Sequence, residues 1–164
     1  MIVKDIKFED FINEVDPKYR EFAMQMNEYM MQNDCKLKMT LAKNGYVVSY
    51  QFGKKKRVIL NFVFRKIGLF ARIYADNIGQ FPEVLDTFPE KMAQTIKKAP
   101  ECKRFSDPSQ CNPKCNGYLF TISDTQYQKC RYNCFLFAVN EESIPFIKSL
   151  TENEIKIRKS AEAS

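Results

Sequence analysis

Five of the six cysteines lie between positions 102 and 134 of a chain that has 164 residues and no histidine. They are Cys102, Cys111, Cys115, Cys130 and Cys134. Thiolates are soft ligands, and four of them around one ion make the usual tetrahedral site of structural zinc. Because the chain offers no imidazole, the cluster predicts a zinc site built from sulfur alone.

The choice of four ligands follows from the position of each cysteine in the predicted elements. Cys111 and Cys115 are separated by three residues that include a proline, Cys102 follows a predicted helix, and Cys130 lies on a predicted strand. Cys134 begins an apolar run, and on an extended strand it would lie about 13 Å from Cys130. We therefore predict that Cys102, Cys111, Cys115 and Cys130 bind zinc and that Cys134 packs in the core. Four protein ligands leave no open coordination position, so the zinc is predicted to be structural.

Basic residues flank the predicted ligands, namely Lys103, Arg104, Lys114, Lys129 and Arg131. They would offset the charge of about two negative units on a zinc tetrathiolate, but they would equally lower the pKa of a reactive thiol. The ligand spacing of eight, three and fourteen intervening residues is not that of the common zinc motifs. Unliganded thiols, reversible disulfide chemistry and an iron–sulfur cluster therefore stay open, and a thiol-dependent redox or sensor protein is the first alternative function.

A second group of side chains alternates along three predicted strands at 46–52, 58–65 and 69–74. One face of these strands carries polar and aromatic residues among apolar ones: Ser49, Gln51, Asn61, Arg65, Arg72 and Tyr74 with Val47, Ile59, Val63 and Phe70. Such a mixed face is typical of a small-ligand pocket, although ordinary solvent exposure would also explain it. We predict that Ser49, Asn61, Arg72 and Tyr74 bind a small anionic or aromatic molecule, with Arg72 as the anchor for the anion.

Nucleic-acid binding is a second alternative, carried by the run Lys54–Arg57. Lys36, Lys38 and Lys43 with Tyr46 and Tyr50 would extend this run into a basic, aromatic surface. A solvated turn whose lysines discourage edge pairing explains the run as well. The formal charge of +6, from 26 basic and 20 acidic residues, is only a small excess of positive charge and favours the solvated turn.

Catalysis is not indicated. The absence of histidine removes the usual general base near neutral pH. Glu141, Glu142 and Asp76 lie at predicted strand or helix ends, and adjacent acidic residues at a helix start are usually surface groups that complement the helix dipole. The chain also lacks glycine-rich phosphate loops and nucleophile motifs, so we predict a binding module with no catalytic residues.

The hydrophobic periodicity predicts an α+β domain with the order ααββββαββα. Helices are predicted over 6–15 and from Asp16-Pro17, a four-stranded meander over 35–74, and a helical segment from 81 that restarts at Pro89. Strands over 118–122 and 126–139 and a helix after Ser143 complete a predicted antiparallel sheet of about six strands, with helices on one face. We predict one domain over residues 1–160 with a cysteine-rich loop at 101–117. The C-terminus is predicted to fray from about Lys156, with a disordered tail at 161–164.

The helix-then-meander layout, the motif Asn44-Gly45-Tyr46-Val47-Val48-Ser49-Tyr50 and the segment Lys129-Cys130-Arg131-Tyr132 resemble small uncharacterised bacterial proteins of the YdhG-like kind. The resemblance covers residues 16–155, and the cysteine-rich loop departs from it. It implies a bacterial, cytosolic α+β protein and transfers no catalytic residue. No apolar run approaches the roughly 20 residues that cross a bilayer, and the charged N-terminus is unlike a signal peptide, so we expect a cytoplasmic protein with no membrane partner.

Overall fold

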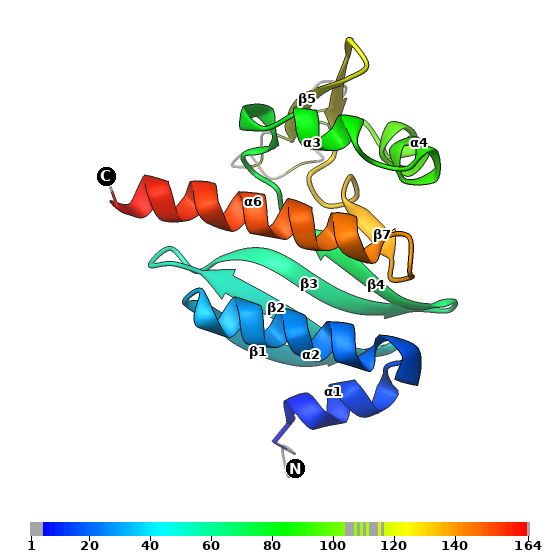
Figure 1. Cartoon of the computed structure of the whole chain (residues 1–164), viewed down its shortest axis with the longest axis vertical. Coiled ribbons are helices and arrows are strands. Elements are labelled where there is room, and N and C mark those ends of the chain that lie inside the picture. The colour runs from blue at the N-terminus through cyan, green and yellow to red at the C-terminus, as the bar shows by residue number, and fades with distance from the viewer. Residues whose placement is uncertain are drawn as a thin grey trace.

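The computed structural model describes residues 5–103, 107, 109, 111, 115 and 117–163. Two helices precede a meander of four strands, as predicted (Figure 1). The elements are α1 (Phe8–Glu14), α2 (Pro17–Gln32), β1 (Cys35–Ala42), β2 (Gly45–Phe52), β3 (Arg57–Arg65), β4 (Gly68–Ile73), the 3-10 helix η1 (Ile78–Gln80), α3 (Glu83–Asp86), α4 (Glu90–Lys98), β5 (Tyr118–Ile122), β6 (Thr125–Lys129), β7 (Leu136–Ala138) and α6 (Ile144–Ala163).

Helix α2 begins where the sequence predicts. The Asp16 side chain accepts a hydrogen bond from the Lys18 backbone N–H at 3.0 Å, and Pro17 occupies the first helical position, where no N–H is needed. The apolar stripe of the helix is buried and consists of Phe22, Ala23, Met26 and Met30. The methionine-rich stripe therefore belongs to the core.

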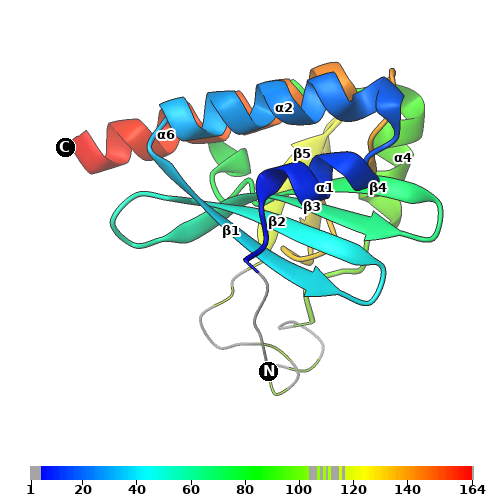
Figure 2. The same cartoon turned by 90° about the horizontal axis from the view of Figure 1, so that it is seen from below.

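The main sheet is antiparallel, with the strand order β1-β2-β3-β4-β7. Helices α1, α2 and α6 lie over one of its faces (Figure 2). The core between these layers is rich in aromatic rings. The centroid of the Phe62 ring lies 5.8 Å from that of Phe11 and 6.0 Å from that of Phe22. The inward face of each strand is thus apolar, and the opposite face carries the polar residues singled out above.

The predicted sixth strand over 126–139 is interrupted, which corrects the prediction of one six-stranded sheet. Strands β5 and β6 form a separate hairpin, and the chain then makes a turn in which the Cys134 N–H donates to the Cys130 carbonyl at 2.9 Å. The Phe135 carbonyl accepts from the Ile73 N–H at 2.9 Å, and β7 continues as the partner of β4. The α+β class, the antiparallel pairing and the helices on one face are confirmed.

The C-terminal helix is longer than predicted. Helix α6 continues to Ala163, so the expectation of fraying from about Lys156 is wrong. Glu154 and Arg158 give this stretch a polar sequence, yet both side chains are buried. Arg158 donates to the Tyr74 carbonyl at 2.8 Å and ties the helix to the end of β4. Residues 161–163 of the predicted disordered tail lie in the last turn of α6, and residue 164 lies outside the described residues.

Candidate ligand pocket and cysteine cluster

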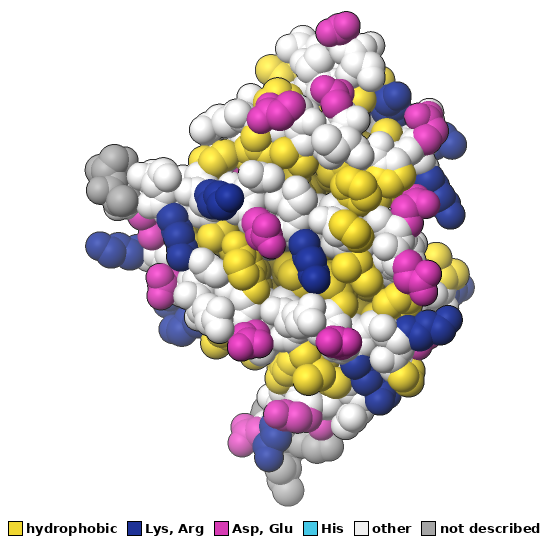
Figure 3. All heavy atoms as spheres, viewed as in Figure 1, with side chains coloured by type: hydrophobic (Ala, Val, Ile, Leu, Met, Phe, Trp, Pro, Cys, Tyr) yellow, Lys and Arg dark blue, Asp and Glu magenta, His cyan; other side chains and the backbone are white. Residues whose placement is uncertain are grey.

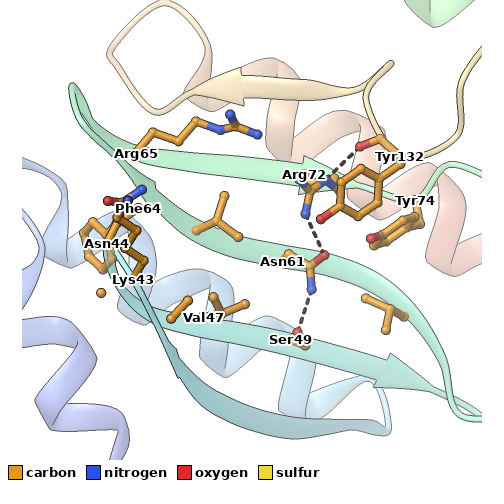
Figure 4. A pocket seen from close by; sticks show the side chains of 14 residues that line it. Lys43, Asn44, Val47, Ser49, Asn61, Phe64, Arg65, Arg72, Tyr74 and Tyr132 are labelled. Atoms are coloured by element: carbon orange, nitrogen blue, oxygen red, sulfur yellow. Dashed lines mark hydrogen bonds between the residues drawn. The ribbon is translucent and has the colours of Figure 1, made fainter. Parts of the chain in front are cut away.

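A row of three polar side chains crosses strands β2, β3 and β4. The strand register pairs Ser49 with Asn61 and Asn61 with Arg72, which places the three side chains side by side. The Asn61 Nδ2 donates to the Ser49 Oγ at 2.6 Å, and the Arg72 Nη1 donates to the Asn61 Oδ1 at 3.5 Å (Figure 4). The alternation of two strand faces is what brings these residues together.

This row forms the floor of a pocket of about 510 Å³. All four predicted ligand-binding residues line it. The lining comprises Ser49, Asn61, Arg72 and Tyr74 together with Ala42, Lys43, Asn44, Gly45, Val47, Val58, Val63, Phe64, Arg65 and Tyr132. The walls are therefore a mixture of apolar, aromatic and cationic side chains, as the sequence indicated.

Arg72 is the buried cation of the pocket, with 4% of its surface exposed. Its Nε donates to the Tyr132 carbonyl at 2.8 Å, and the Tyr132 ring covers the guanidinium with its centroid 3.9 Å from Cζ. The four ion pairs formed within the described residues do not include Arg72. Its charge is therefore solvated by neutral oxygens and a ring instead of a carboxylate.

Tyr74 forms the wall next to Arg72 and is 8% exposed. Burial raises the pKa of its hydroxyl, with Arg72 acting in the opposite direction, so the group is neutral near pH 7. The Arg131 guanidinium stacks on the Tyr74 ring, 4.4 Å from the centroid. Arg131 is itself held by Asp76, whose Oδ1 accepts from the Arg131 Nε at 2.6 Å.

Two features of the pocket differ from the sequence expectation. Tyr132 was missed because its turn was read as part of a strand. Ile59, predicted on the pocket face, is fully buried in the core. The cause is a register shift between Tyr50 and Gln51: Tyr50 pairs with Leu60, Gln51 pairs with Val58, and Ile59 is skipped. This irregularity reverses the alternation, so that Val58 takes the pocket position.

One residue of the basic, aromatic surface considered as the second alternative does not lie on that surface. Tyr50 is fully buried, and its hydroxyl donates to the Asn27 Oδ1 at 2.7 Å, so the expectation that its ring lies on a basic surface is wrong. Arg57 pairs with Asp76 at 3.5 Å, and Glu162 accepts from the Lys54 backbone N–H at 3.3 Å. Basic and acidic side chains are also interspersed over the helical face (Figure 3).

The cysteine cluster is organised around β6. On one edge of this strand, Glu101 pairs with Lys129, the Cys102 N–H donates to the Gln128 carbonyl at 3.2 Å, and the Cys130 N–H donates to the Pro100 carbonyl at 2.8 Å. On the other edge, Tyr118 pairs with Lys129. Cys102 and Cys130 therefore belong to neighbouring, hydrogen-bonded segments.

The segment before β5 also approaches this point. Gly117 has φ +67°, and a Cβ added to it would lie 2.7 Å from the Cys102 Sγ, so the position leaves no room for a side chain. Cys115 is two residues away in the sequence and shares a hydrogen bond with the Cys111 thiol. Loss of solvation raises the pKa of Cys111, followed by the negative potentials of Cys115, Cys102 and Cys130. Cys111 thus lies close enough to all three of the other predicted ligands for them to raise its pKa.

Cys134 differs from this set in its environment. The turn after β6 brings it next to Cys130, so the separation of about 13 Å expected on an extended strand is wrong. Cys134 is fully buried in the core, as predicted, and burial raises the pKa of its thiol well above the ordinary value. None of the six cysteines, all of which are described, takes part in a disulfide bond. Within the described residues, no three histidine, cysteine or acidic side chains are already gathered at metal-binding geometry.

Comparisons of the chain with protein-family models, with curated proteins and with solved structures find no match. The resemblance to YdhG-like proteins therefore stays an expectation. Among the helices in the described part of the chain, none combines the length and apolar character needed to traverse a bilayer.

Proposed function

We propose that the protein is a non-catalytic binding module that takes a small anion with a planar or aromatic body into the pocket on the open sheet face. The observation that carries the proposal is the buried Arg72 guanidinium without a carboxylate partner among the described residues. Burying a charge is costly unless an opposite charge accompanies it. A bound carboxylate or phosphate would supply that opposite charge.

The groups around Arg72 fit such a ligand. A guanidinium binds planar oxyanions through paired N–H donors, and aromatic rings favour a flat apolar body. The Ser49 hydroxyl, the Asn61 amide and the neutral Tyr74 hydroxyl would complete the polar contacts. The volume of about 510 Å³ lies within the range of small-molecule sites.

The rim of the pocket adds attraction at longer range. Lys43 and Arg65 are exposed and line the same cavity. Cations at the mouth of a cleft raise the local concentration of an anion and the rate at which it enters. Affinity is therefore expected to fall moderately with ionic strength, while the contact to buried Arg72 persists.

The test is a titration of the protein with benzoate, inorganic phosphate and neutral benzamide, followed by NMR chemical shifts. Benzoate is expected to shift the signals of Arg72, Tyr74 and Tyr132 and to bind at least about tenfold more tightly than benzamide, a difference of about 1.4 kcal/mol. Tighter binding of phosphate than of benzoate would identify a phosphoryl group as the preferred anion.

Matched variants make the test specific. Arg72→Met should abolish benzoate binding, Arg72→Lys should retain part of it, and Lys91→Met, at an exposed site on α4, should leave it unchanged. Equal affinities for benzoate and benzamide, or unchanged binding by a folded Arg72→Met protein, would contradict the proposal. Salt-dependent retention of oligonucleotides that is lost when Lys54, Lys55 and Lys56 are neutralised would favour nucleic-acid binding instead.

A further inference from the structure

We infer that Cys102, Cys111, Cys115 and Cys130 together bind one zinc ion, which joins the loop before β5 to the edge of β6. The inference concerns a site separate from the pocket and does not depend on anion binding.

The first support is the convergence of three chain segments at one end of β6. The backbone hydrogen bonds of Cys102 with Gln128 and of Cys130 with Pro100 fix two cysteine-bearing segments next to each other. Gly117 lies across the sheet register from Cys130, one residue beyond the pair Tyr118–Lys129. Because a Cβ added to Gly117 would lie 2.7 Å from the Cys102 sulfur, the backbone two residues after Cys115 lies beside Cys102.

The second support is the location of these thiols outside the apolar core. Three of the four, Cys111, Cys115 and Cys130, are partly exposed, whereas Cys35 and Cys134 are buried in the apolar core. Core packing accounts for Cys35 and Cys134, whereas Cys102, which is also buried, lies outside the core cluster together with the partly exposed thiols. Four sulfurs with no histidine nearby favour zinc, which accepts a tetrahedral set of thiolates.

The third support is the local charge. Lys129 precedes Cys130, is 5% exposed and takes part in none of the ion pairs of the described residues. Its ammonium donates to the Lys97 and Ala99 carbonyls at 2.7 and 2.9 Å, at the end of α4. A zinc tetrathiolate carries about two negative charges, so a buried cation close in sequence would stabilise it.

Zinc binding requires the four sulfurs to draw together, since no three of the described side chains are at ligand distance already. This is ordinary for a structural site, where the ion supplies the free energy that orders its ligands. Each thiol loses its proton to solvent as its sulfur binds the ion, and no electrons are transferred. Affinity must therefore rise with pH as proton competition weakens.

The experiment begins with protein purified without chelator, in which zinc is measured by elemental analysis. We expect about one zinc per chain, and reconstitution with cobalt(II) should give the intense thiolate charge-transfer absorption of a tetrahedral sulfur site. Alkylation followed by peptide mass spectrometry should show the four thiols protected in the zinc form and modified after a chelator is added. This readout needs no variant and does not depend on how a substituted protein folds.

Substitutions then assign the ligands. Cys111→Ser, Cys115→Ser and Cys130→Ser should each lower zinc affinity by more than roughly 100-fold, the largest loss typical of removing a group that only supports a ligand. Cys35→Ser and Cys134→Ala are the matched controls and should retain the metal. Failure to take up added zinc, retention of zinc by a Cys111→Ser/Cys115→Ser protein, or isolation with a disulfide between two of the four thiols would overturn the assignment.

Discussion

The Arg72 guanidinium lies over the Tyr132 ring, with Cζ 3.9 Å from the ring centroid, while its Nε donates to the Tyr132 backbone carbonyl at 2.8 Å. Tyr132 thus stabilises the charge of the buried Arg72 guanidinium through its ring and fixes the orientation of the guanidinium through its carbonyl. Tyr132 is 56% exposed, so its ring separates Arg72 from solvent on that side. The pocket floor and the turn after β6 are therefore coupled through this contact.

Replacing Tyr132 by alanine should destabilise the protein by about 1 kcal/mol, because the cation–π contact with Arg72 is lost. Tyr132→Phe keeps the ring and the backbone carbonyl and should match the wild type. Urea unfolding monitored by circular dichroism measures both. Equal destabilisation by the two variants would show that the hydroxyl, and not the ring, matters.

Asp76 is expected to be the most sensitive carboxylate outside the pocket. It pairs with Arg131 at 2.6 Å, Arg158 at 3.1 Å and Arg57 at 3.5 Å, and its side chain is 19% exposed. Asp76→Asn leaves these arginines without that charge and should cost about 3 kcal/mol of the unfolding free energy. Glu83→Gln, at an exposed position of α3, is the control and should change stability little. A loss at Asp76 no larger than that at Glu83 would contradict the role of this network.

Alkaline pH should destabilise the protein through its buried phenols. Burial raises the pKa of Tyr50, and that of Tyr118 well above its ordinary value. The unfolded chain releases these protons near the ordinary pKa of about 10, whereas the folded protein holds them. The contribution of the two buried phenols to the unfolding free energy is therefore fully present below pH about 10 and is lost as pH rises further.

The measurement is phenolate absorbance followed after a jump to alkaline pH. Tyr50 and Tyr118 should ionise only at the rate of unfolding. Tyr50→Phe should reduce the slow phase and should also cost about 1 kcal/mol through loss of the bond to Asn27. Tyr132→Phe, at an exposed site, should leave the slow phase intact, and a slow phase unaffected by Tyr50→Phe would refute the assignment.

Cys35 should resist alkylation in the native protein. It is 6% exposed, and burial raises the pKa of its thiol to about 11, so little thiolate is present near pH 8. Iodoacetamide labelling with mass spectrometry should modify Cys35 only after denaturant is added. Modification of Cys35 at the rate of an unfolded-chain thiol would contradict the buried position.

Removal of zinc should weaken anion binding if both proposals hold. Cys130 lies at the start of the turn that carries Arg131 and Tyr132, the residues that stack on Tyr74 and Arg72. A coupling on the order of tenfold is expected between chelator-treated and zinc-loaded protein. Benzoate titrations of the two forms measure it, with chelator-treated protein reloaded with zinc as the control. An unchanged affinity would show that the turn is held by Asp76 and Arg72 alone.

Several features were determined by the sequence because they depend on short-range order. The cap at Asp16-Pro17 sets the start of α2, and strict alternation along 46–52, 58–65 and 69–74 defines three strands with one polar face. Neighbouring antiparallel strands align residues of the same face, so the grouping of Ser49, Asn61, Arg72 and Tyr74 follows from periodicity and turn lengths alone.

Tertiary structure alone decided where that regularity fails. The apolar residues after Cys130 favour a strand. In the structure β7 pairs with β4 and does not join the β5–β6 hairpin, so the chain must turn at Cys130. This turn places Tyr132 on the pocket. Ile59 turns inward at a register shift that single-strand alternation cannot reveal. Glu154 and Arg158 give the tail a polar sequence, but the structure pairs Arg158 with Tyr74 and Asp76 and pairs Glu154 with Asn77. In each case the deciding contact comes from residues distant in the chain, so its free energy has no signature in the local pattern.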